Sequence, residues 1–280
     1  MMEAPNSGTG ILPVRSGSHR RDARAIKYAL LRFSLLLSAL FVIAAMEPPS
    51  LPIIVPPEQA AKEGHALVNE MLSQQPDANT VTGTMAIRIG SNYTEIPIKF
   101  ETIVTRTNWL SVYTTPGADR SHNANLTVVH TDGQPNRYLV ANINRPPTDT
   151  NQYIELNSAQ LFSPFVDHSD FFIADLGLEF IHWPDQKLLQ KEMRRSRSCR
   201  VLESTNPHPE QGGYAKVKSW VDNETHGILL AQAFDVKGNK IKEFEPEDFS
   251  KVSGQWQLEK MQIRNAKIDS TTTVKFNLGK

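Results

Sequence analysis

The sequence lacks the features that mark most disulfide-rich proteins and nucleic-acid-binding proteins. It has a single cysteine, Cys199, in 280 residues, which excludes an intramolecular disulfide framework and a cysteine-rich metal site. Lysine plus arginine number 30 and aspartate plus glutamate also number 30, so the formal net charge is zero. A basic nucleic-acid-binding groove is therefore not indicated. Cys199 lies in a predicted strand, where a lone thiol usually serves as a small core residue.

Catalytic motifs are also missing. The sequence contains no Gly-rich phosphate loop, no GxSxG elbow, no HExxH helix and no CxxC pair. Asp167, His168 and Asp170 form the group "DHSD", but nearly consecutive loop residues are an unusual ligand spacing, and a capping or loop role is expected. His182 lies three residues from Glu179, on what should be a solvent-exposed helix face. We expect no enzymatic activity, no cofactor and no metal.

Residues 1–46 have the pattern of an N-terminal extension followed by a secretory signal peptide. A short apolar core at residues 30–46 follows a cluster of basic residues and ends in the small residues Ala44 and Ala45. Cleavage there would deliver the chain to the periplasm. The alternative is an uncleaved segment anchored in the inner membrane, for which the apolar run is short. No cysteine lies near this site, so we expect a soluble product without a lipid-modified N-terminus.

A Pro-rich linker and a helix come next. Residues 47–57, "EPPSLPIIVPP", should be extended. Residues 58–74 predict a helix with one apolar side, ended by Gln75 and Pro76. Residues 58–280 are expected to form one domain.

From Thr80 the hydrophobic period changes to two, which is typical of strands with one buried face. Two such runs flank the turn "GSN" and predict a hairpin. Further strands are predicted at 108–115, 124–131 and 137–144, after which "RPPTDTNQ" breaks the series. Past Gln190 the same period returns in "CRVLES", "YAKVKSWVD", "GILLAQAFD", "IKEFEPEDF", "GQWQLEKMQIRN" and "STTTVKFNL". The pattern predicts about ten or eleven consecutive antiparallel strands, a sheet large enough to curl.

Two helical segments interrupt the strands, at residues 157–165 and 170–183. In the second, Phe172, Leu176, Phe180 and Trp183 recur at helical steps, with Ser169 as its expected cap and Pro184 as its end. A curved sheet with an apolar concave side needs a cover, and these helices could supply it. A loose fit would leave a cavity for an apolar ligand. A tight fit would make the aromatic residues ordinary core.

The order and spacing of several motifs resemble a known family. "DFFIADLGLEFIHWPDQKLLQKEM", "SCRVLES", the run from "GYAKVKSWVD" to "MQIRN", and the terminal "STTTVKFNL" are similar to the outer-membrane lipoprotein-sorting proteins with the LolA/LolB-like fold. The resemblance extends over residues 170–278 and, more loosely, over residues 58–144. Residues 116–165 are longer and more polar than the family pattern.

The resemblance implies a mainly β (α+β) fold: a curved antiparallel sheet forming a half-open barrel of about eleven strands, lidded by helices. It implies a periplasmic carrier that holds the acyl chains of lipoproteins or lipids and moves them toward the outer membrane. Its partners would be membrane-bound donor and acceptor proteins. It would also make transient contact with a membrane surface. The alternative is a non-transport envelope protein of the same fold that binds a protein partner or senses lipid. In the family's carriers an early-strand arginine holds the lid closed; Arg88 and Arg106 both qualify here.

The expected site is a hydrophobic cavity with a basic patch outside it. The residues expected to line the cavity are inward-facing strand positions and the apolar side of the lid helix: Met85, Ile87, Ile98, Phe100, Trp109, Tyr113, Phe172, Leu176, Phe180 and Trp183. Burial there would contribute about 0.8 kcal/mol per methylene. Arg194, Arg195 and Arg197, in a predicted loop, are either a solvated turn or a patch for anionic head groups or an acidic partner.

Overall fold

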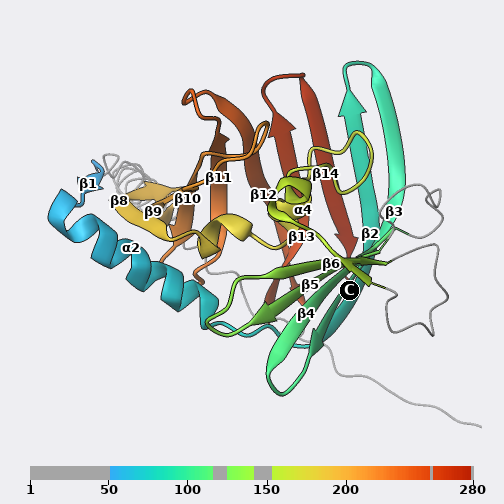
Figure 1. Ribbon diagram of the computed structural model, residues 1–280, viewed down its shortest axis with the longest axis horizontal. Helices are drawn as coiled ribbons and strands as arrows, with labels where there is room; N and C mark the ends of the chain where they lie inside the picture. The colour runs from blue at the N-terminus through green and yellow to red at the C-terminus, as the bar shows by residue number, and fades with distance from the viewer. Residues whose placement is uncertain (1–50, 116–124, 142–152, 253–254, 279–280) are drawn as a thin grey trace, which may run out of the picture. The chain divides into compact units, whose positions relative to one another are not determined.

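One curved antiparallel sheet dominates the structure (Figure 1). The computed structural model describes residues 51–115, 125–141, 153–252 and 255–278, which belong to one unit, residues 51–280. The predicted signal peptide at residues 1–46 and much of the polar region 116–165 lie outside the described residues. In the described ranges, no helix combines the length and apolar composition that a bilayer crossing requires.

Fourteen strands in the described ranges make up this sheet. The first half of the chain contributes β1 (Ile53–Ile54), β2 (Asn79–Ile89), β3 (Asn92–Val104), β4 (Asn108–Thr114), β5 (Asn125–Thr131), β6 (Arg137–Ala141) and β7 (Tyr153–Glu155). The second half contributes β8 (Asp185–Arg194), β9 (Arg197–Thr205), β10 (Lys216–Asp222), β11 (Ile228–Phe234), β12 (Lys240–Val252), β13 (Gln255–Asn265) and β14 (Ser270–Asn277). The sheet is open, since β1 and β7 are its two edges.

The strand order explains why the concave face is covered. The order is β1-β8-β9-β10-β11-β12-β13-β14-β2-β3-β4-β5-β6-β7, so β2 starts in the middle and the chain runs outward to the β7 edge. It must then return across the whole sheet to β8 before it runs back to β14. Residues 157–183 make that return over the concave face, and we call them the plug segment (Figure 1).

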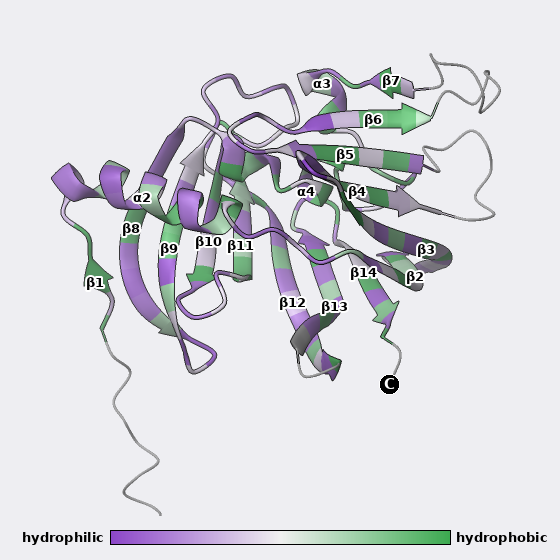
Figure 2. Ribbon diagram, turned by 90° about the horizontal axis from the view of Figure 1, so that it is seen from below, coloured by the Kyte–Doolittle hydropathy of each residue, from purple (hydrophilic) through white to green (hydrophobic). Residues whose placement is uncertain are grey.

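Period-two patterning holds the sheet in register. Met85 and Ile87 on β2 pair with Ile96 and Thr94 on β3 across the predicted hairpin turn, where Gly90 takes a φ of 56°. Hydrophobic and hydrophilic residues alternate along the strands (Figure 2), so one face is apolar. Register shifts occur between β8 and β9, β10 and β11, β11 and β12, and β12 and β13. Such bulges increase local twist and favour curvature.

The sequence predicted about eleven strands, and the described residues form fourteen. The three missed strands, β1, β7 and β8, lack a clear alternation of apolar and polar residues. The short strand β1 lies inside the Pro-rich stretch expected to be a linker, and β7 follows the stretch that breaks the strand pattern. Strand β8 has few apolar residues, since its sequence is DQKLLQKEMR. Strand β1 pairs with β8, β7 pairs with β6, and β8 pairs with β9. These three strands form because of this pairing, which the local sequence pattern does not reveal.

The first predicted helix is confirmed as α2 (Pro57–Leu72). Its Pro57 stands in the first turn, where the missing N–H costs no helical hydrogen bond. Leu67 and Val68 are buried in a cluster with Leu188, Leu202 and Val221 of β8, β9 and β10. Helix α2 therefore covers one end of the concave face.

The predicted single helix at residues 170–183 is wrong. The segment folds as α4 (Ile173–Leu176) and a 3-10 helix, η1 (Glu179–His182), separated by Leu178 at a φ of 49°. A Cβ at Gly177 would lie 2.3 Å from the Tyr138 hydroxyl oxygen, so the break brings the backbone against the sheet. The predicted helix at 157–165 shortens to α3 (Ser158–Leu161), capped by Asn157 and Gln160.

Candidate functional site

The concave face and the plug segment together form one apolar core. Met85, Ile87 and Ile98 of the sheet are buried in the same cluster as Phe180 and Trp183 of the plug segment. Tyr113, Phe172 and Leu176 are partly buried and pack against it. The structure thus brings most of the predicted cavity residues into contact with one another.

Phe100 and Trp109 occupy the margin of this core. The Phe100 ring lies 4.9 Å from the Tyr113 ring, centroid to centroid. Trp109 on β4 stacks on His130 of β5, with ring centroids 3.6 Å apart and an interplanar angle of 12°. An aromatic stack of this kind stabilises a pair of neighbouring strands, and it places Trp109 beside the core.

The plug segment fills the concave face in this conformation. Phe165, Phe171 and Ile173 are each 1% exposed and Phe180 is 2% exposed. The larger of the two pockets described, about 340 Å³, lies at the margin of the plug segment, where Ile87, Ile89, Asn92 and Thr94 face Asp167 and His168. An acyl chain would therefore have to displace plug side chains to reach the residues predicted to line the cavity.

A buried polar cluster joins the plug segment to the sheet. Lys242 of β12 is 2% exposed, and its Nζ donates a hydrogen bond of 2.5 Å to the Asp170 carbonyl oxygen. The same Nζ lies 3.8 Å from Asp175 Oδ2 and 2.9 Å from the centroid of the Phe172 ring. The plug segment is thus fixed to the sheet by a cation as well as by apolar contacts.

Both aspartates of this cluster are held by further donors. The Asp170 carboxylate accepts hydrogen bonds from the Ser270 hydroxyl and, at 3.0 Å, from the Thr272 hydroxyl. Asp175 Oδ2 accepts from the Phe172 N–H at 2.7 Å and from the Tyr214 hydroxyl at 3.1 Å. Asp175 Oδ1 is buried and accepts no hydrogen bond from the described residues.

The pKa values show that burial outweighs pairing in this cluster. Burial raises the pKa of Asp175 to about 6, although Lys242 and its hydrogen bonds act to lower it. Burial likewise lowers the pKa of Lys242 to about 8 against the attraction of Asp175 and Asp170. An ion pair that stays ionised at such a cost adds little net stability.

A second polar contact lies under η1. The Tyr138 hydroxyl donates to Glu179 Oε2 at 2.9 Å, and Asn136 Nδ2 donates to the Gly177 carbonyl oxygen at 2.8 Å. Burial raises the pKa of Glu179 and lowers that of His182. The prediction that His182 would be solvent-exposed is therefore wrong, because the residue is half-buried and lies close enough to His130 of β5 to affect its pKa.

The cation that contacts the plug segment differs from the one expected. Arg88 and Arg106 are both exposed, and Lys242 takes that place. Ser169 also does not cap a helix: its hydroxyl donates to the Phe171 carbonyl oxygen within a turn. A sequence signal for Lys242 exists, since it shares the strand parity of buried Phe244.

The basic patch is a hairpin turn and not the predicted loop. Arg195 and Ser196 have φ angles of 49° and 60° and connect β8 to β9. Arg195 pairs with Glu245 at 2.5 Å, and Arg194 lies 4.0 Å from the same carboxylate. Glu245 thus already supplies a counter-charge to two of the three arginines.

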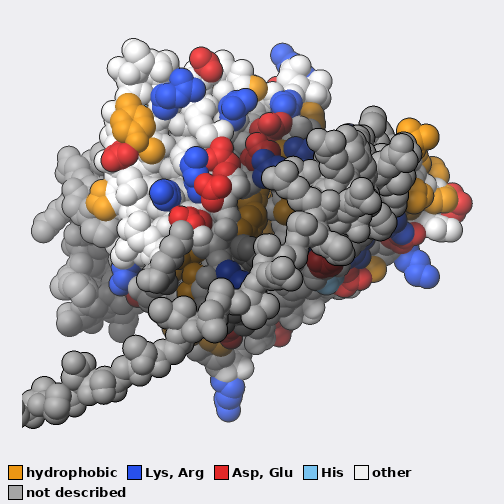
Figure 3. Space-filling view, turned by 180° about the vertical axis from the view of Figure 1, so that it is seen from behind, with side chains coloured by type: hydrophobic (Ala, Val, Ile, Leu, Met, Phe, Trp, Pro, Cys, Tyr) orange, Lys and Arg blue, Asp and Glu red, His pale blue; other side chains and the backbone are white. Residues whose placement is uncertain are grey.

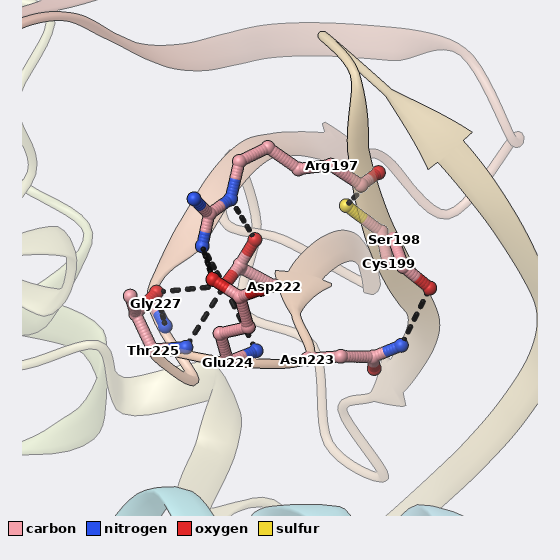
Figure 4. A network of polar contacts seen from close by, with 8 residues as sticks. All are labelled: Arg197, Ser198, Cys199, Asp222, Asn223, Glu224, Thr225 and Gly227. Atoms are coloured by element: carbon pink, nitrogen blue, oxygen red, sulfur yellow. Dashed lines mark hydrogen bonds and ion pairs between the residues drawn. The ribbon is translucent and has the colours of Figure 1, made fainter.

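Arg197 belongs to a polar network between β9 and the β10–β11 turn (Figure 4). It donates from Nε and Nη2 to the carboxylate of Asp222 and from Nη2 to Glu224 at 2.9 Å. Asp222 also accepts from the Thr225 N–H at 2.8 Å. The Arg197 guanidinium is the main cause that holds the pKa of Asp222 well below its usual range, and hydrogen bonds from Thr225 and Glu224 in the turn lower it further. Nearby Cys199 is buried, as predicted.

Charges of both signs are interspersed on the described part of the face seen from behind (Figure 3). Among the described residues, ion pairs such as Lys99 with Glu101, at 2.9 Å, and Lys260 with Glu247, at 2.6 Å, join surface charges of opposite sign. This arrangement is typical of a solvated surface.

Comparisons with solved structures define the class of the fold. A DUF1329 family protein from Desulfovibrio piger is similar at a TM-score of 0.62 and 18% identity, over 78% of this chain and 91% of that one. A putative outer membrane lipoprotein-sorting protein domain from Vibrio parahaemolyticus gives 0.62 and 15%, over 78% and 92%. A LolA superfamily protein from Nitrosomonas europaea gives 0.52 and 17%, over 78% and 92%. The chain has the LolA-like fold.

The family model that matches residues 108–278 is described as "Uncharacterized protein", and the chain belongs to that family. No curated protein matches the sequence. The likeness in fold agrees with the half-open, lidded sheet that the resemblance implied.

Proposed function

We propose that this protein is a periplasmic carrier that binds the acyl chains of lipoproteins or lipids on its concave face and moves them toward the outer membrane. The observation that supports this most is the cover itself. A wide apolar face is closed by a crossing segment with only short helical turns, held by a buried ion pair in which burial opposes ionisation. Such a segment can leave without unfolding the sheet.

Binding would then be a competition between plug side chains and acyl chains for the same wall. Met85, Ile87, Ile98, Phe100, Trp109 and Tyr113 would be the sheet side of the site. Phe172, Leu176, Phe180 and Trp183 would be the plug side. The covered and open states need differ by only a few kcal/mol for a ligand to shift their populations.

Arg194, Arg195 and Arg197 would contact anionic head groups or an acidic partner during transfer. Their present partners are Glu245, Asp222 and Glu224. Exchange of partners at Arg194 and Arg195 would cost little, because their pairs with Glu245 are partly exposed, whereas Arg197 would keep its hydrogen bonds to the buried Asp222.

Lipid extraction and probe displacement test the proposal. The protein is purified from a bacterial periplasm, its bound lipid is analysed by mass spectrometry, and a fluorescent fatty-acid probe is titrated. We expect co-purified lipid and displacement of the probe by acyl-chain lipids. A folded protein that carries no lipid and does not bind the probe would contradict the proposal.

A variant pair tests the competition. Phe180→Ala removes a plug ring that is 2% exposed and weakens the covered state, so probe affinity should rise at least threefold. Leu178→Ala, at a plug residue 39% exposed, is the matched control and should change affinity little. Phe172→Asp combined with Phe180→Asp places charge on plug side chains that pack in the core of the covered state, so it should weaken that state more than Phe180→Ala does and raise probe affinity further; unchanged affinity in that folded variant would contradict the assigned site.

The tight packing also supports a second candidate, a non-transport envelope protein that binds a protein partner at a sheet edge. Tyr153 and Ile154 on edge strand β7 are 49% and 46% exposed. Under this alternative, lipid and probe binding would be missing, and substitution of Ile154 by Lys would weaken partner binding.

A further inference from the structure

The centre of the concave face carries three buried polar groups among apolar neighbours. Lys242 is 2% exposed, and Ser270 and Thr272 are both 0% exposed. Ser270 and Thr272 lie two residues apart on β14, and Lys242 reaches them across β13, since Asn265 pairs with both Lys242 and Ser270. Ile263 and Phe244, on the same face, are buried apolar residues.

An aspartate of the plug segment occupies this place. Asp170, itself 2% exposed, accepts the Ser270 and Thr272 hydroxyl hydrogens on its two carboxylate oxygens. Its N–H donates to Thr272 Oγ1 at 2.8 Å, and its carbonyl oxygen accepts from Lys242. The three sheet residues thus surround a carboxylate with two hydroxyl donors and a neighbouring ammonium group.

The charge balance of Lys242 depends on the plug segment. The carboxylates that act on it are Asp175 and Asp170, both in the plug segment, whereas its strand partners on the sheet are Ala233 and Asn265. Departure of the plug segment would remove both counter-charges together. A cation on an apolar face without an anion is costly, so an incoming ligand that brings an anion would be favoured over one that does not.

We infer that Lys242, Ser270 and Thr272 form a subsite for the carboxylate of an acyl-chain ligand, and that Asp170 occupies this subsite when the protein is closed. The inference rests on the proposed function and narrows its ligand to acyl chains with an anionic end, of which a free fatty acid is the simplest. A carboxylate fits best because the group already held there is a carboxylate, with one hydroxyl donor for each oxygen. The acyl chain would extend from it over the neighbouring apolar wall.

The ratio of the affinities for a fatty acid and for the alcohol of the same chain length tests this subsite. Hexadecanoic acid, hexadecan-1-ol and hexadecyl phosphate each displace an uncharged fluorescent acyl probe from the full chain at pH 7. Acid and alcohol have the same chain length and require the same opening of the plug segment, so the free energy of opening cancels in the ratio of their affinities. We expect the wild-type protein to bind the acid at least tenfold more tightly than the alcohol.

The variants assign the preference to these residues. Lys242→Met, and separately Ser270→Ala with Thr272→Val, should reduce the ratio to below threefold, with circular dichroism to verify folding. The second variant preserves side-chain size, so it decides the matter if Lys242→Met does not fold. Lys240→Met, at an exposed residue of the same strand, and Thr273→Val, at the partly buried residue that follows Thr272 on β14, are the matched controls and should keep the ratio.

The outcomes separate this inference from the proposed function. Equal binding of acid and alcohol by the wild-type protein, or a preference that survives in the folded variants, would overturn the subsite while leaving acyl binding intact. Stronger binding of hexadecyl phosphate than of the acid would overturn the carboxylate assignment. Failure of every ligand to bind would overturn the proposed function and the subsite with it.

Discussion

Helix α2 and the plug segment cover the same face of the sheet but are attached to it in different ways. Helix α2 is a regular helix of 16 residues with an apolar side on β8 to β10 and partly exposed ion pairs around it, such as Glu70 with Arg200 at 2.7 Å and Glu63 with Lys191 at 3.0 Å. The plug segment has only short turns and is attached through Asp170, Asp175 and Lys242, all buried.

This difference suggests which cover stays and which one moves. Exposed ion pairs lose little solvation energy when they form and add little to the free energy of unfolding. Helix α2 is therefore held mainly by the burial of its apolar side against the sheet. The plug segment adds a buried ion pair, whose desolvation opposes its attraction. Loss of α2 would expose apolar surface with no compensation, whereas an anionic amphiphile could replace both the apolar and the charged contacts of the plug segment.

The largest expected effect is loss of the buried cation. Lys242→Met leaves the buried Asp175 without its cation, so its carboxyl group must either stay ionised and unpaired or bind a proton, and the free energy of unfolding should fall by about 3–5 kcal/mol. Lys240→Met, which removes only a partly exposed pair with Glu243, should cost less than about 1 kcal/mol. Urea unfolding at pH 7 measures both. Equal losses of unfolding free energy in the two variants would show that the buried ion pair does not make the attachment of the plug segment different from that of α2.

The next effect is a pH dependence carried by Asp175. Because burial raises its folded-state pKa from 3.8 to about 6, the stability it contributes is present below pH 3.8 and is lost as the pH rises through about 6. Asp175→Asn has no such loss. The unfolding free energy of the variant minus that of the wild type should therefore increase by about 2.4 kcal/mol between pH 4 and pH 7.

The difference between variant and wild type is needed because a histidine acts in the opposite direction. Burial lowers the pKa of His130 to about 4, so the stability it contributes is lost as the pH falls from its usual 6.5 through that value. Urea titrations of both proteins at several pH values give the difference directly. A difference that does not change with pH would contradict the assignment to Asp175.

A smaller effect is expected where α2 approaches β8. A Cβ at Gly64 would lie 2.6 Å from the Gln186 carbonyl oxygen, so Gly64→Ala should push the helix outward and cost about 1–3 kcal/mol, despite the better helix propensity of alanine. His65→Ala, at the exposed neighbouring position, is the control and should not destabilise. A neutral Gly64→Ala would mean that α2 does not pack as closely as the structure indicates.

The smallest effect belongs to the exposed anchors of α2. Glu70→Gln removes the pairs with Arg200 and His226 and should cost less than about 1 kcal/mol, since the Glu70 side chain is 44% exposed and solvent screens both pairs. The same urea titrations measure it. A loss comparable with that of Lys242→Met would remove the contrast between the two covers.

Much of the sheet was predictable from sequence, because strands with one buried face alternate visibly. The β2–β3 hairpin and the strands from β9 to β14 follow that pattern, and α2 follows the helical one. Strand β8 was missed because Gln186 and Lys187 precede its apolar residues; buried Gln186 instead donates to the Phe180 and Trp183 carbonyl oxygens. Its place depends on side-chain contacts with the plug segment that no local window contains.

The plug segment shows the limit of periodicity most clearly. Phe172, Leu176, Phe180 and Trp183 have helical spacing, yet Leu178 interrupts the helix so that both its turns can face the sheet. Because of that interruption, the Asp175 side chain is buried and lies 3.8 Å from the ammonium group of Lys242, which is 67 positions later in the chain. A pattern of apolar residues can predict which segment is buried, but it does not predict which charged residues are buried with it.

Hydrogen exchange with and without hexadecanoic acid tests the central claim most directly. The amides of Phe165, Ile173 and Asp175 are hydrogen-bonded within the plug segment, and those of α2 within its helix. Saturating ligand should reduce the protection of residues 157–183 while leaving residues 57–72 unchanged. Unchanged or increased protection of the plug segment in a ligand-saturated protein would contradict the account.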